Sequence, residues 1–461
     1  NPVRILDAGM QLSYMAIAGV SLGNYGMKRL HKKTGFRRFQ KRYPLRFRVV
    51  QSLFYSVTLQ GMMLPVVAKT YYEIPVYAGL LNLIVVPGMT VVVAGSWFGL
   101  LVSIGTISLG RFVMLPVGWM LQGYTWLCER TLELPWNTLV TGEIRGWQIG
   151  MWYGGIACTL VLLRTKTRNK LRDFVYKHTG RFWRKREVVR YTVCTILISM
   201  LLQGAGQALC VWQQRTEAIC FLDVGQGDGI LIRSPDGRNI VIDGGSTSQS
   251  KCGTYTLLPA LRSQGMTEID CWFVTHTDED HISGLKELLL QGKLTQIKVR
   301  TIVFSAYVFQ DAALAELETM IRAAGITIVW MREGDVIGDD TFTLTCLHPT
   351  AEYRAKDKNA ASLALAYHSD TFDMLFTGDM DADAVADMDI QQDYDCIKLP
   401  HHGSKYSYVE GVYAHADYGL ISCGYNNRYG HPHAEVLQGL AQEGTKVLRT
   451  DEMGAVIFRS R

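Results

Sequence analysis

The segment Val274–Gly284, with the sequence VTHTDEDHISG, concentrates titratable side chains directly after an apolar run. His276 ends the run, and Asp278, Asp280 and His281 follow within five residues. Imidazole and carboxylate groups are the ligands that borderline and hard divalent metals prefer. We therefore expect metal ligands on this turn, although a carboxylate such as Asp278 could equally cap the helix that follows.

Two further apolar segments end in side chains of the same kind. Asp379 closes the run LFTGD, and the pair His401 and His402 closes CIKLPHHGS. Because strand ends can converge on one edge of a sheet, we expect these groups to meet His276 in a site for two divalent ions. Any one of these histidines alone would be explained as well by an ordinary surface position. Neighbouring strand residues point to opposite faces, so the choice between His401 and His402 stays open, with His402 favoured.

Short apolar segments separated by Gly-rich turns make up the chain from residue 214 onward. The pattern predicts early strands that end at Asp223 and Asp243, helices over residues 256–264 and 311–325, and a helix that begins near Ile282. Further predicted strands cover residues 270–276, 301–306, 326–331, 342–348, 362–368 and 373–379. Strands alternating with a few helices predict one α/β sandwich over residues 214–461.

The first half of the chain has a different composition. Up to Glu217 it holds 27 Lys and Arg and 8 Asp and Glu, whereas from Ala218 onward the counts are 20 and 34. Frequent Gly and Pro in its apolar runs are typical of helix packing. The runs predict a polytopic α-helical membrane domain over residues 1–213, with about six spans near residues 5–26, 49–69, 76–97, 100–127, 147–163 and 191–211.

Positive charge in the connections predicts the orientation of these spans. The segment Lys28–Arg48 holds ten Lys and Arg and no acid, and Arg164–Arg190 holds eleven and two acids. Such loops stay in the cytoplasm, whereas the connections near residues 70–75 and 129–146 have little positive charge and are expected outside. Six spans then place everything after Gln213 outside. Topology and lipid contact explain the basic loops without a role in binding DNA or an ATPase.

Taken together, the motifs resemble those of the metallo-β-lactamase superfamily. THTDEDHISGL is similar to its signature H-x-H-x-D-H, with Asp278 in place of the second histidine, and LFTGD and LPHHGS are similar to its bridging-aspartate and final-histidine motifs. FLDVGQGDGILI, VIDGG, NAASLALAY and GYNNRYGHPHAEVL resemble the ComEC family of DNA-uptake channels, and NPVRILDAGMQLSYMAIAG resembles the start of that family's competence membrane region. The family's N-terminal soluble module and first membrane helices have no counterpart here, so we expect a part of a longer protein.

The resemblance implies an αββα sandwich that holds two divalent metal ions, Mn²⁺ or Zn²⁺. Asp379 would bridge the two ions, and the carboxylate of Asp278 favours the harder Mn²⁺. The superfamily's middle histidine has no counterpart in a motif, and His348 and His368 are the candidates for it. The implied ligands are His276, Asp278, Asp280, His281, Asp379 and one of His401 and His402.

It also implies metal-assisted hydrolysis of DNA, in which Asp280 orients the attacking water or accepts its proton. Asp228 and His431 could lie at the rim and contact phosphate or protonate the leaving oxygen, although a turn Asp and a loop His explain them equally well. The implied setting is the bacterial cytoplasmic membrane, with the C-terminal domain outside. The implied partners are single-stranded DNA, the lipid bilayer, a DNA receptor, a cytoplasmic ATPase and single-strand-binding proteins, and a homo-oligomer is compatible with the family.

Three functions remain open. The protein could be an uptake channel with an outside nuclease that degrades the strand not transported, a channel with a non-catalytic DNA-binding domain, or a membrane-tethered phosphodiesterase with another substrate. The excess of acids after Ala218 repels a polyanion, so we expect weak, metal-dependent engagement of DNA. The ten cysteines show no metal-binding spacing, and buried free thiols are expected rather than disulfides.

Overall fold

The computed structural model describes residues 7–32, 34–163, 216–388, 390 and 392–460. The chain divides into two compact units, Asn1–Cys210 and Val211–Arg461, which are considered separately below. The expected sixth span at 191–211 and the second basic loop, Arg164–Arg190, lie outside the described residues.

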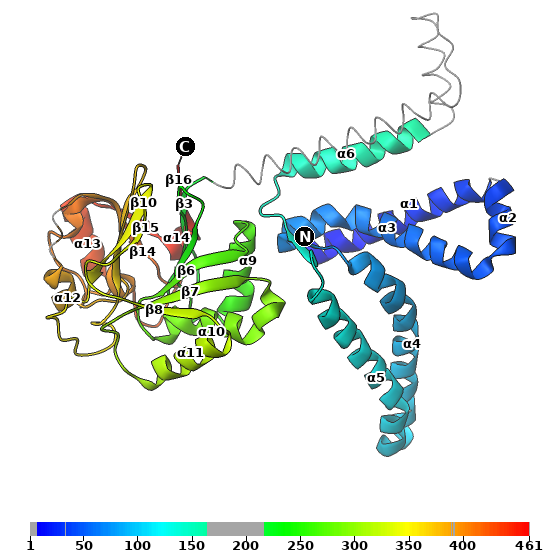
Figure 1. Ribbon diagram of the computed structural model, residues 1–461, viewed down its shortest axis with the longest axis horizontal. Coiled ribbons are helices and arrows are strands. Elements are labelled where there is room, and N and C mark those ends of the chain that lie inside the picture. The colour runs from blue at the N-terminus through cyan, green and yellow to red at the C-terminus, as the bar shows by residue number, and fades with distance from the viewer. Residues whose placement is uncertain (1–6, 33, 164–215, 389, 391, 461) are drawn as a thin grey trace, which may run out of the picture. The chain divides into compact units, whose positions relative to one another are not determined.

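The described part of the first unit is helical (Figure 1). Its helices are α1 (Ala8–His31), α2 (Thr34–Arg42), α3 (Pro44–Tyr71), α4 (Ala78–Gly105), α5 (Ile107–Leu132) and α6 (Gly146–Leu163). Among them, α3 and α4 are long and apolar enough to cross a membrane. Two expectations are corrected. Residues 34–42, expected as part of a basic connection, form a helix, and the break between the third and fourth spans falls at Thr106 rather than between residues 97 and 100.

Glycines allow the helices of this unit to approach closely. A Cβ on Gly19 of α1 would lie 2.7 Å from the Cα of Leu59 in α3. In the hairpin of α4 and α5, a Cβ on Gly99 would lie 2.4 Å from Cγ of Met114. The expected packing role of Gly in the apolar runs is therefore confirmed at these positions.

A proline in α3 is compensated by a side chain of α6. Pro65 has no backbone N–H, so it leaves the carbonyl of Gly61, one helical turn earlier, without its usual partner. The indole Nε1 of Trp152 donates to this carbonyl at 2.8 Å, and the hydroxyl of Tyr153 donates to Met62 O at 2.8 Å. An apolar helix thereby keeps its backbone groups satisfied.

The two connections that are short of positive charge pair with each other. Strand β1 (Glu73–Pro75), which follows α3, is antiparallel to β2 (Thr138–Val140), which follows α5. The two connections therefore lie at the same end of this unit, separated along the chain by the α4–α5 hairpin.

The second unit contains two seven-stranded sheets. The first has the order β16-β3-β4-β5-β6-β7-β8, comprising Val456–Arg459, Ala218–Phe221, Gly229–Arg233, Asn239–Asp243, Glu268–Val274, Lys298–Ser305 and Thr327–Met331. The second has the order β15-β14-β13-β12-β11-β10-β9, comprising Lys446–Arg449, Ala416–Ile421, Tyr394–Lys398, Asp373–Phe376, Ala364–Ser369, Phe342–His348 and Val336–Gly338. The strands after residue 400 were not predicted from the sequence.

Alternation along the strands builds the core between the two sheets. Along β10 every second side chain is buried, and Phe342 and Leu344 meet Phe221 and Ile230 of the first sheet. A second apolar layer lies under α9 (Leu258–Ser263), α10 (Glu279–Gln291) and α11 (Ala312–Ala323), and a third lies under α13 (Ala434–Glu443). Helices therefore cover the outer face of each sheet, and the expected αββα sandwich is confirmed (Figure 1).

Parallel strands bring the polar chain segments to one edge. In the first sheet β5, β6, β7 and β8 run parallel, and in the second sheet β12, β13, β14 and β15 do. The carboxyl ends of parallel strands meet at the same edge of a sheet, so the segments after β5, β6, β12, β13 and β14 gather there. Two short helices, α12 (Ala382–Asp387) and α14 (Thr450–Met453), complete this unit.

The cysteines of this unit are free thiols. Cys220, Cys252, Cys346, Cys396 and Cys423 are buried and Cys271 is partly buried, and none of these six forms a disulfide. The expectation of unpaired thiols is confirmed for these positions.

Candidate metal centre

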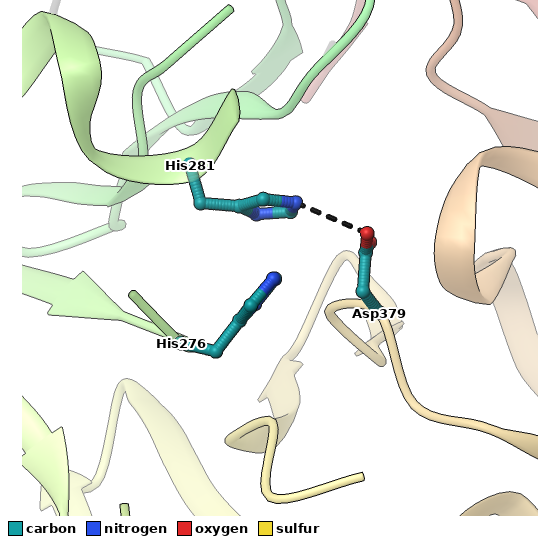
Figure 2. Close-up of side chains that lie close together, drawn as sticks. All are labelled: His276, His281 and Asp379. Atoms are coloured by element: carbon teal, nitrogen blue, oxygen red, sulfur yellow. Dashed lines mark ion pairs between the residues drawn. The ribbon is translucent and has the colours of Figure 1, made fainter. Parts of the chain in front are cut away.

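Two histidines and an aspartate form the middle of the site (Figure 2). His276 follows β6, whereas His281 stands in the first turn of α10, which begins at Glu279 rather than near Ile282. Their rings are 4.1 Å apart, and Nε2 of His281 lies 3.3 Å from Oδ2 of Asp379. One ligand atom from each of the three residues fits within 4.8 Å.

Asp379 is delivered by a tight turn after β12. Gly378 has a φ of 56°, and a Cβ there would lie 2.9 Å from Cβ of Ser362 and 3.1 Å from Cβ of Thr275. A larger residue would therefore be both strained and crowded. The Asp379 amide donates to Ser362 Oγ at 3.2 Å, which orients the turn toward the histidines.

His402 enters from the second sheet. It does not extend a strand, because β13 ends at Lys398 and the following turn holds both His401 and His402 in the left-handed region, with φ of 49° and 56°. This conformation is costly for residues other than glycine and occurs often at functional sites. Nε2 of His402 lies 3.3 Å from Oδ2 of Asp379 and 3.5 Å from Oδ2 of Asp280.

The second ring nitrogen of two of these histidines is already engaged. Nδ1 of His281 is 2.8 Å from Oδ2 of Asp243, and Nδ1 of His402 is 2.8 Å from Ser422 O. In each pair the acceptor is an oxygen, so the ring donates from Nδ1, and Nε2 faces Asp379 as the atom that would bind a metal once its proton is displaced. Asp243 is held in turn by the amide and hydroxyl of Thr275, at 2.8 and 2.7 Å.

The atoms that point into the centre have no hydrogen-bond partner in the described part of the chain. They are Nε2 of His276, His281 and His402, and Oδ1 of Asp379. All four side chains are buried. Buried polar atoms are seldom left unsatisfied, and imidazole with carboxylate is a set that divalent metals bind, so these residues fit a metal ion.

Charges reinforce one another across the cluster. Burial alone would lower the pKa of His281, but the carboxylates of Asp379 and Asp243 raise it well above its usual value. Burial likewise opposes the positive form of His402, whereas Asp379 and Asp280 raise its pKa to about 10. The two histidines in turn hold the pKa of Asp379 well below its usual range, against the effect of burial. Without metal the site therefore holds protons, and a metal ion must displace them.

Beneath the histidines lies a buried ion pair. Nζ of Lys398 contacts Oδ2 of Asp228, donates to Gly378 O at 2.8 Å and lies 3.6 Å from Oδ1 of Asp379. Lys398 is 1% exposed and Asp228 is 2% exposed. Asp228 was expected at the rim, and this expectation is wrong, because the loop that carries it is tied under α10 by the bond from Asp228 N to Asp280 O at 3.1 Å.

The remaining expected residues lie around the cluster. Oδ2 of Asp278 is 3.6 Å from Nε2 of His276, but its Oδ1 pairs with Lys358, and Asp278 belongs to none of the sets of ligand atoms that converge in the described residues. His401 also stands outside these sets. Its ring is 5.7 Å from that of His431, which in turn is 6.3 Å from that of His402, so His431 borders the centre.

Neither candidate for the middle histidine reaches the cluster. His348 is buried and its Nδ1 lies 3.0 Å from Ser362 O, with its ring against Tyr353. His368 is exposed and pairs with Asp373. Each lies outside the converging ligand sets of the described chain.

Two functional residues were missed from the sequence. Asp243 ends β5 before a Gly-Gly turn, and this position gives the same signal that pointed to Asp379. Lys398 is a lysine inside the apolar run CIKL, four residues before His402. A charged residue within a buried strand is rare without a partner, and that rarity could have pointed to it.

Comparison with known proteins gives a similarity for each unit. Residues 1–166 match the family model described as "Competence protein", and residues 222–351 match the model described as "Metallo-beta-lactamase superfamily". The chain is 26% identical over 478 residues to ComE operon protein 3 of Bacillus subtilis (strain 168), covering 100% of this chain and 56% of that protein. It is 27% identical over 289 residues to Competence protein ComA of Neisseria gonorrhoeae, covering 58% of this chain and 38% of that protein.

The chain thus spans about half the length of the first of these curated relatives and less of the second. Among solved structures, the metallo-beta-lactamase fold protein YhfI from Bacillus subtilis is 13% identical with a TM-score of 0.36, covering 53% of this chain and 100% of that chain.

Proposed function

This chain joins a competence-protein domain to a metallo-beta-lactamase domain, and from that premise we propose that it acts in DNA uptake as a membrane channel for single-stranded DNA. In this proposal the second unit is a metal-dependent nuclease that degrades the strand that is not transported. The names of the relatives, both of them competence proteins, support the first part. The metal centre supports the second part.

The observation that carries the nuclease proposal is the convergence on Asp379. Nε2 of His281 and Nε2 of His402 both lie 3.3 Å from its Oδ2, and the two histidines follow strands of different sheets, β6 and β13. His276 and Asp280 lie around the same cluster, and each adds a ligand atom to one of the converging sets. A carboxylate between two groups of imidazoles is suited to bridge two divalent ions such as Mn²⁺ or Zn²⁺.

Metal ions bound here would supply a water of lowered pKa and would offset the charge of a phosphodiester. Asp280 is suited to hold that water, because its side chain is 17% exposed whereas that of Asp379 is 4% exposed. Burial alone would raise the pKa of Asp280, but His402 and His281 lower it below the usual value, so the carboxylate is ionised and can orient that water as a hydrogen-bond acceptor. His431, which borders His402, is placed to contact the leaving group.

The ion pair under the centre has a charge role in this scheme. Lys398 sits among Asp228 and Asp379, where its ammonium offsets carboxylate charge that would otherwise be concentrated in a buried site. Burial would lower the pKa of Lys398, but the two carboxylates raise it, so Lys398 stays positive.

The setting that we propose is the cytoplasmic membrane of a bacterium, with several spans and the second unit outside. The pairing of β1 with β2 supports it, because both acidic connections then lie on one side, opposite the basic connection that contains α2. The proposed partners are DNA, the lipid bilayer, a DNA receptor, a cytoplasmic ATPase and single-strand-binding proteins, and homo-oligomers are compatible with this scheme.

Cleavage of labelled DNA by the full chain in detergent tests the proposal. The protein is stripped with chelator, supplied with Mn²⁺, Zn²⁺ or Mg²⁺, and compared with Asp280→Ala and Asp379→Ala. Asp393→Ala is the matched control, since this carboxylate is 93% exposed and lies outside the converging sets. Cleavage that metal restores and that only the two site variants abolish is the expected result.

Two other results would replace the nuclease proposal. Metal binding without cleavage of any DNA would favour a non-catalytic DNA-binding domain. That alternative has one structural observation in its favour, since neither His348 nor His368 supplies the middle ligand. Hydrolysis of small phosphodiesters without cleavage of DNA would favour an enzyme with another exposed diester substrate.

A further inference from the structure

Two loops beside the metal centre have a composition unlike the rest of the acidic unit. Pro400–Ser407 and Gly424–His433 contain Lys405 and Arg428 and neither Asp nor Glu, although 34 acids occur from Ala218 onward. The loops touch, because His433 N donates to Gly403 O at 3.1 Å and Lys405 N donates to Nδ1 of His433 at 3.3 Å. Together they make a continuous surface whose own residues include no acid.

Exposed tyrosines project from both loops. Tyr406 is 74% exposed, Tyr425 is 85% exposed and Tyr429 is 44% exposed. Three large aromatic side chains left in solvent on two short loops are more than isolated apolar residues. Aromatic faces of this kind stack on unpaired bases.

Cations lie over two of these rings. Nζ of Lys405 is 5.6 Å from the centre of the Tyr406 ring, and the guanidinium of Arg428 is 4.8 Å from that of Tyr429. Glu435 offsets part of the charge of Lys405 at 3.4 Å, whereas Arg428 has no carboxylate partner among the residues that the structure describes. Aromatic faces next to cations match the alternation of bases and phosphates along a nucleic-acid strand.

A continuous series of rings links this surface to the metal centre. The ring of Tyr429 is stacked on His431 at 5.7 Å, and His431 is 6.3 Å from His402, whose Nε2 points toward Asp379. From the other loop, Tyr406 reaches His431 through His433, with ring separations of 6.3 and 5.0 Å. A strand held on the tyrosines would therefore have a phosphate close to the centre.

We propose that these loops form a stacking surface that binds single-stranded polynucleotide and presents it to the metal centre. The inference rests on the proposed nuclease function and deepens it by assigning the form of the substrate. A duplex hides the faces of its bases within its own stack, so the tyrosines select unpaired strands. Stacking supplies the affinity that the acidic unit cannot supply through charge.

Photocrosslinking of the full chain in detergent tests this surface directly. A single-stranded oligonucleotide carrying 5-iodouracil is bound in the presence of chelator, so that no cutting occurs, and crosslinked peptides are identified by mass spectrometry. We expect crosslinks within 400–407 and 424–433, and little crosslinking of a duplex of the same sequence. The position of the crosslinked peptides distinguishes DNA bound at this surface from DNA bound at the basic segments of the first unit.

Substitutions separate stacking from general damage. Tyr406→Ala and Tyr425→Ala are each expected to lower crosslinking at these loops about 5-fold or more, and the double variant should lower it further. Tyr406→Phe and Tyr425→Phe keep the ring and should keep the crosslink. Tyr255→Ala is the matched control, because Tyr255 is 70% exposed on the same unit but outside both loops.

Crosslinks that map elsewhere, or that are equal for single strand and duplex, would overturn the inference. So would crosslinking that survives the double alanine variant. Hydrolysis of the same oligonucleotide by the unaltered protein with Mn²⁺ is measured in parallel. If hydrolysis fails while the tyrosine-dependent crosslink remains, the nuclease proposal falls and the binding surface stands.

Discussion

Oδ2 of Asp243 lies 2.8 Å from Nδ1 of His281, and this contact determines which nitrogen of the ring faces Asp379. A carboxylate behind a metal-binding histidine fixes its tautomer and raises its basicity. Asp243 therefore acts on the centre through His281.

Asp243→Asn is expected to weaken metal binding by about 10- to 100-fold, because an amide is a poorer acceptor for the Nδ1 proton of His281. Competition with a fluorescent chelator measures the change in affinity. Asp393→Asn is the matched control, since this carboxylate is 93% exposed and lies outside the converging sets of the described chain. Unchanged affinity in Asp243→Asn would show that the ring is oriented by other contacts.

His402→Ala and His401→Ala should have unequal effects on bound metal. Nε2 of His402 points into the cluster, whereas His401 lies outside every converging set of ligand atoms in the described chain. We expect His402→Ala to lose at least one ion per chain and His401→Ala to retain both. Elemental analysis of the purified variants decides between them, and equal losses would contradict the assignment.

Lys398→Met should destabilise the second unit by about 3–5 kcal/mol, because it leaves the buried carboxylate of Asp228 uncompensated. In the double variant Lys398→Met/Asp228→Asn both charges of the ion pair are removed, so most of the lost stability should be regained. Denaturant unfolding in the presence of chelator measures both. A double variant no more stable than Lys398→Met would show that the ion pair is not the cause.

His348 predicts a loss of stability toward acid. Burial lowers its pKa in the folded chain, although the bond to Ser362 O partly opposes this effect. The unfolded chain, with an ordinary pKa of about 6.5, then binds more protons, so stability present at neutral pH is lost as the pH falls below about 6.5. His348→Asn keeps a donor for Ser362 O and should flatten this part of the profile. The melting temperature of each protein is measured as a function of pH. The same dependence on pH in the unaltered protein and in His348→Asn would contradict the prediction.

Trp152→Phe should destabilise the first unit by about 1 kcal/mol, because the Gly61 carbonyl loses the indole N–H that donates to it. The cost should shrink in a Pro65→Ala background, where the restored backbone N–H takes the same carbonyl. Thermal unfolding in detergent measures the cost of Trp152→Phe in the protein with Pro65 and in the Pro65→Ala variant. Trp147→Phe on the same helix is the control, and an equal cost with and without Pro65 would contradict this explanation.

Much of the second unit could be predicted from local patterns. Strands β4 and β5 of the first sheet, and Asp379 after β12, stand where an apolar run meets a Gly-rich turn, and those local signals agree with the structure. The helix that carries His281 begins at Glu279, three residues earlier than expected, and Asp278 occupies its N-cap position without a side-chain capping bond. Local signals locate an element well but locate its first residue less well.

The sequence by itself determined the division of charge, the apolar runs, the αββα class and the chemical types that could bind metal, because these follow from composition and periodicity along the chain. Only the tertiary structure decided that His402 rather than His401 faces Asp379, and that Asp228 is buried against Lys398. The burial of Asp228 depends on a contact between segments more than a hundred residues apart, and the choice of His402 depends on a left-handed turn at the two histidines. Neither long-range packing nor an unusual backbone conformation is encoded in the spacing of neighbouring residues.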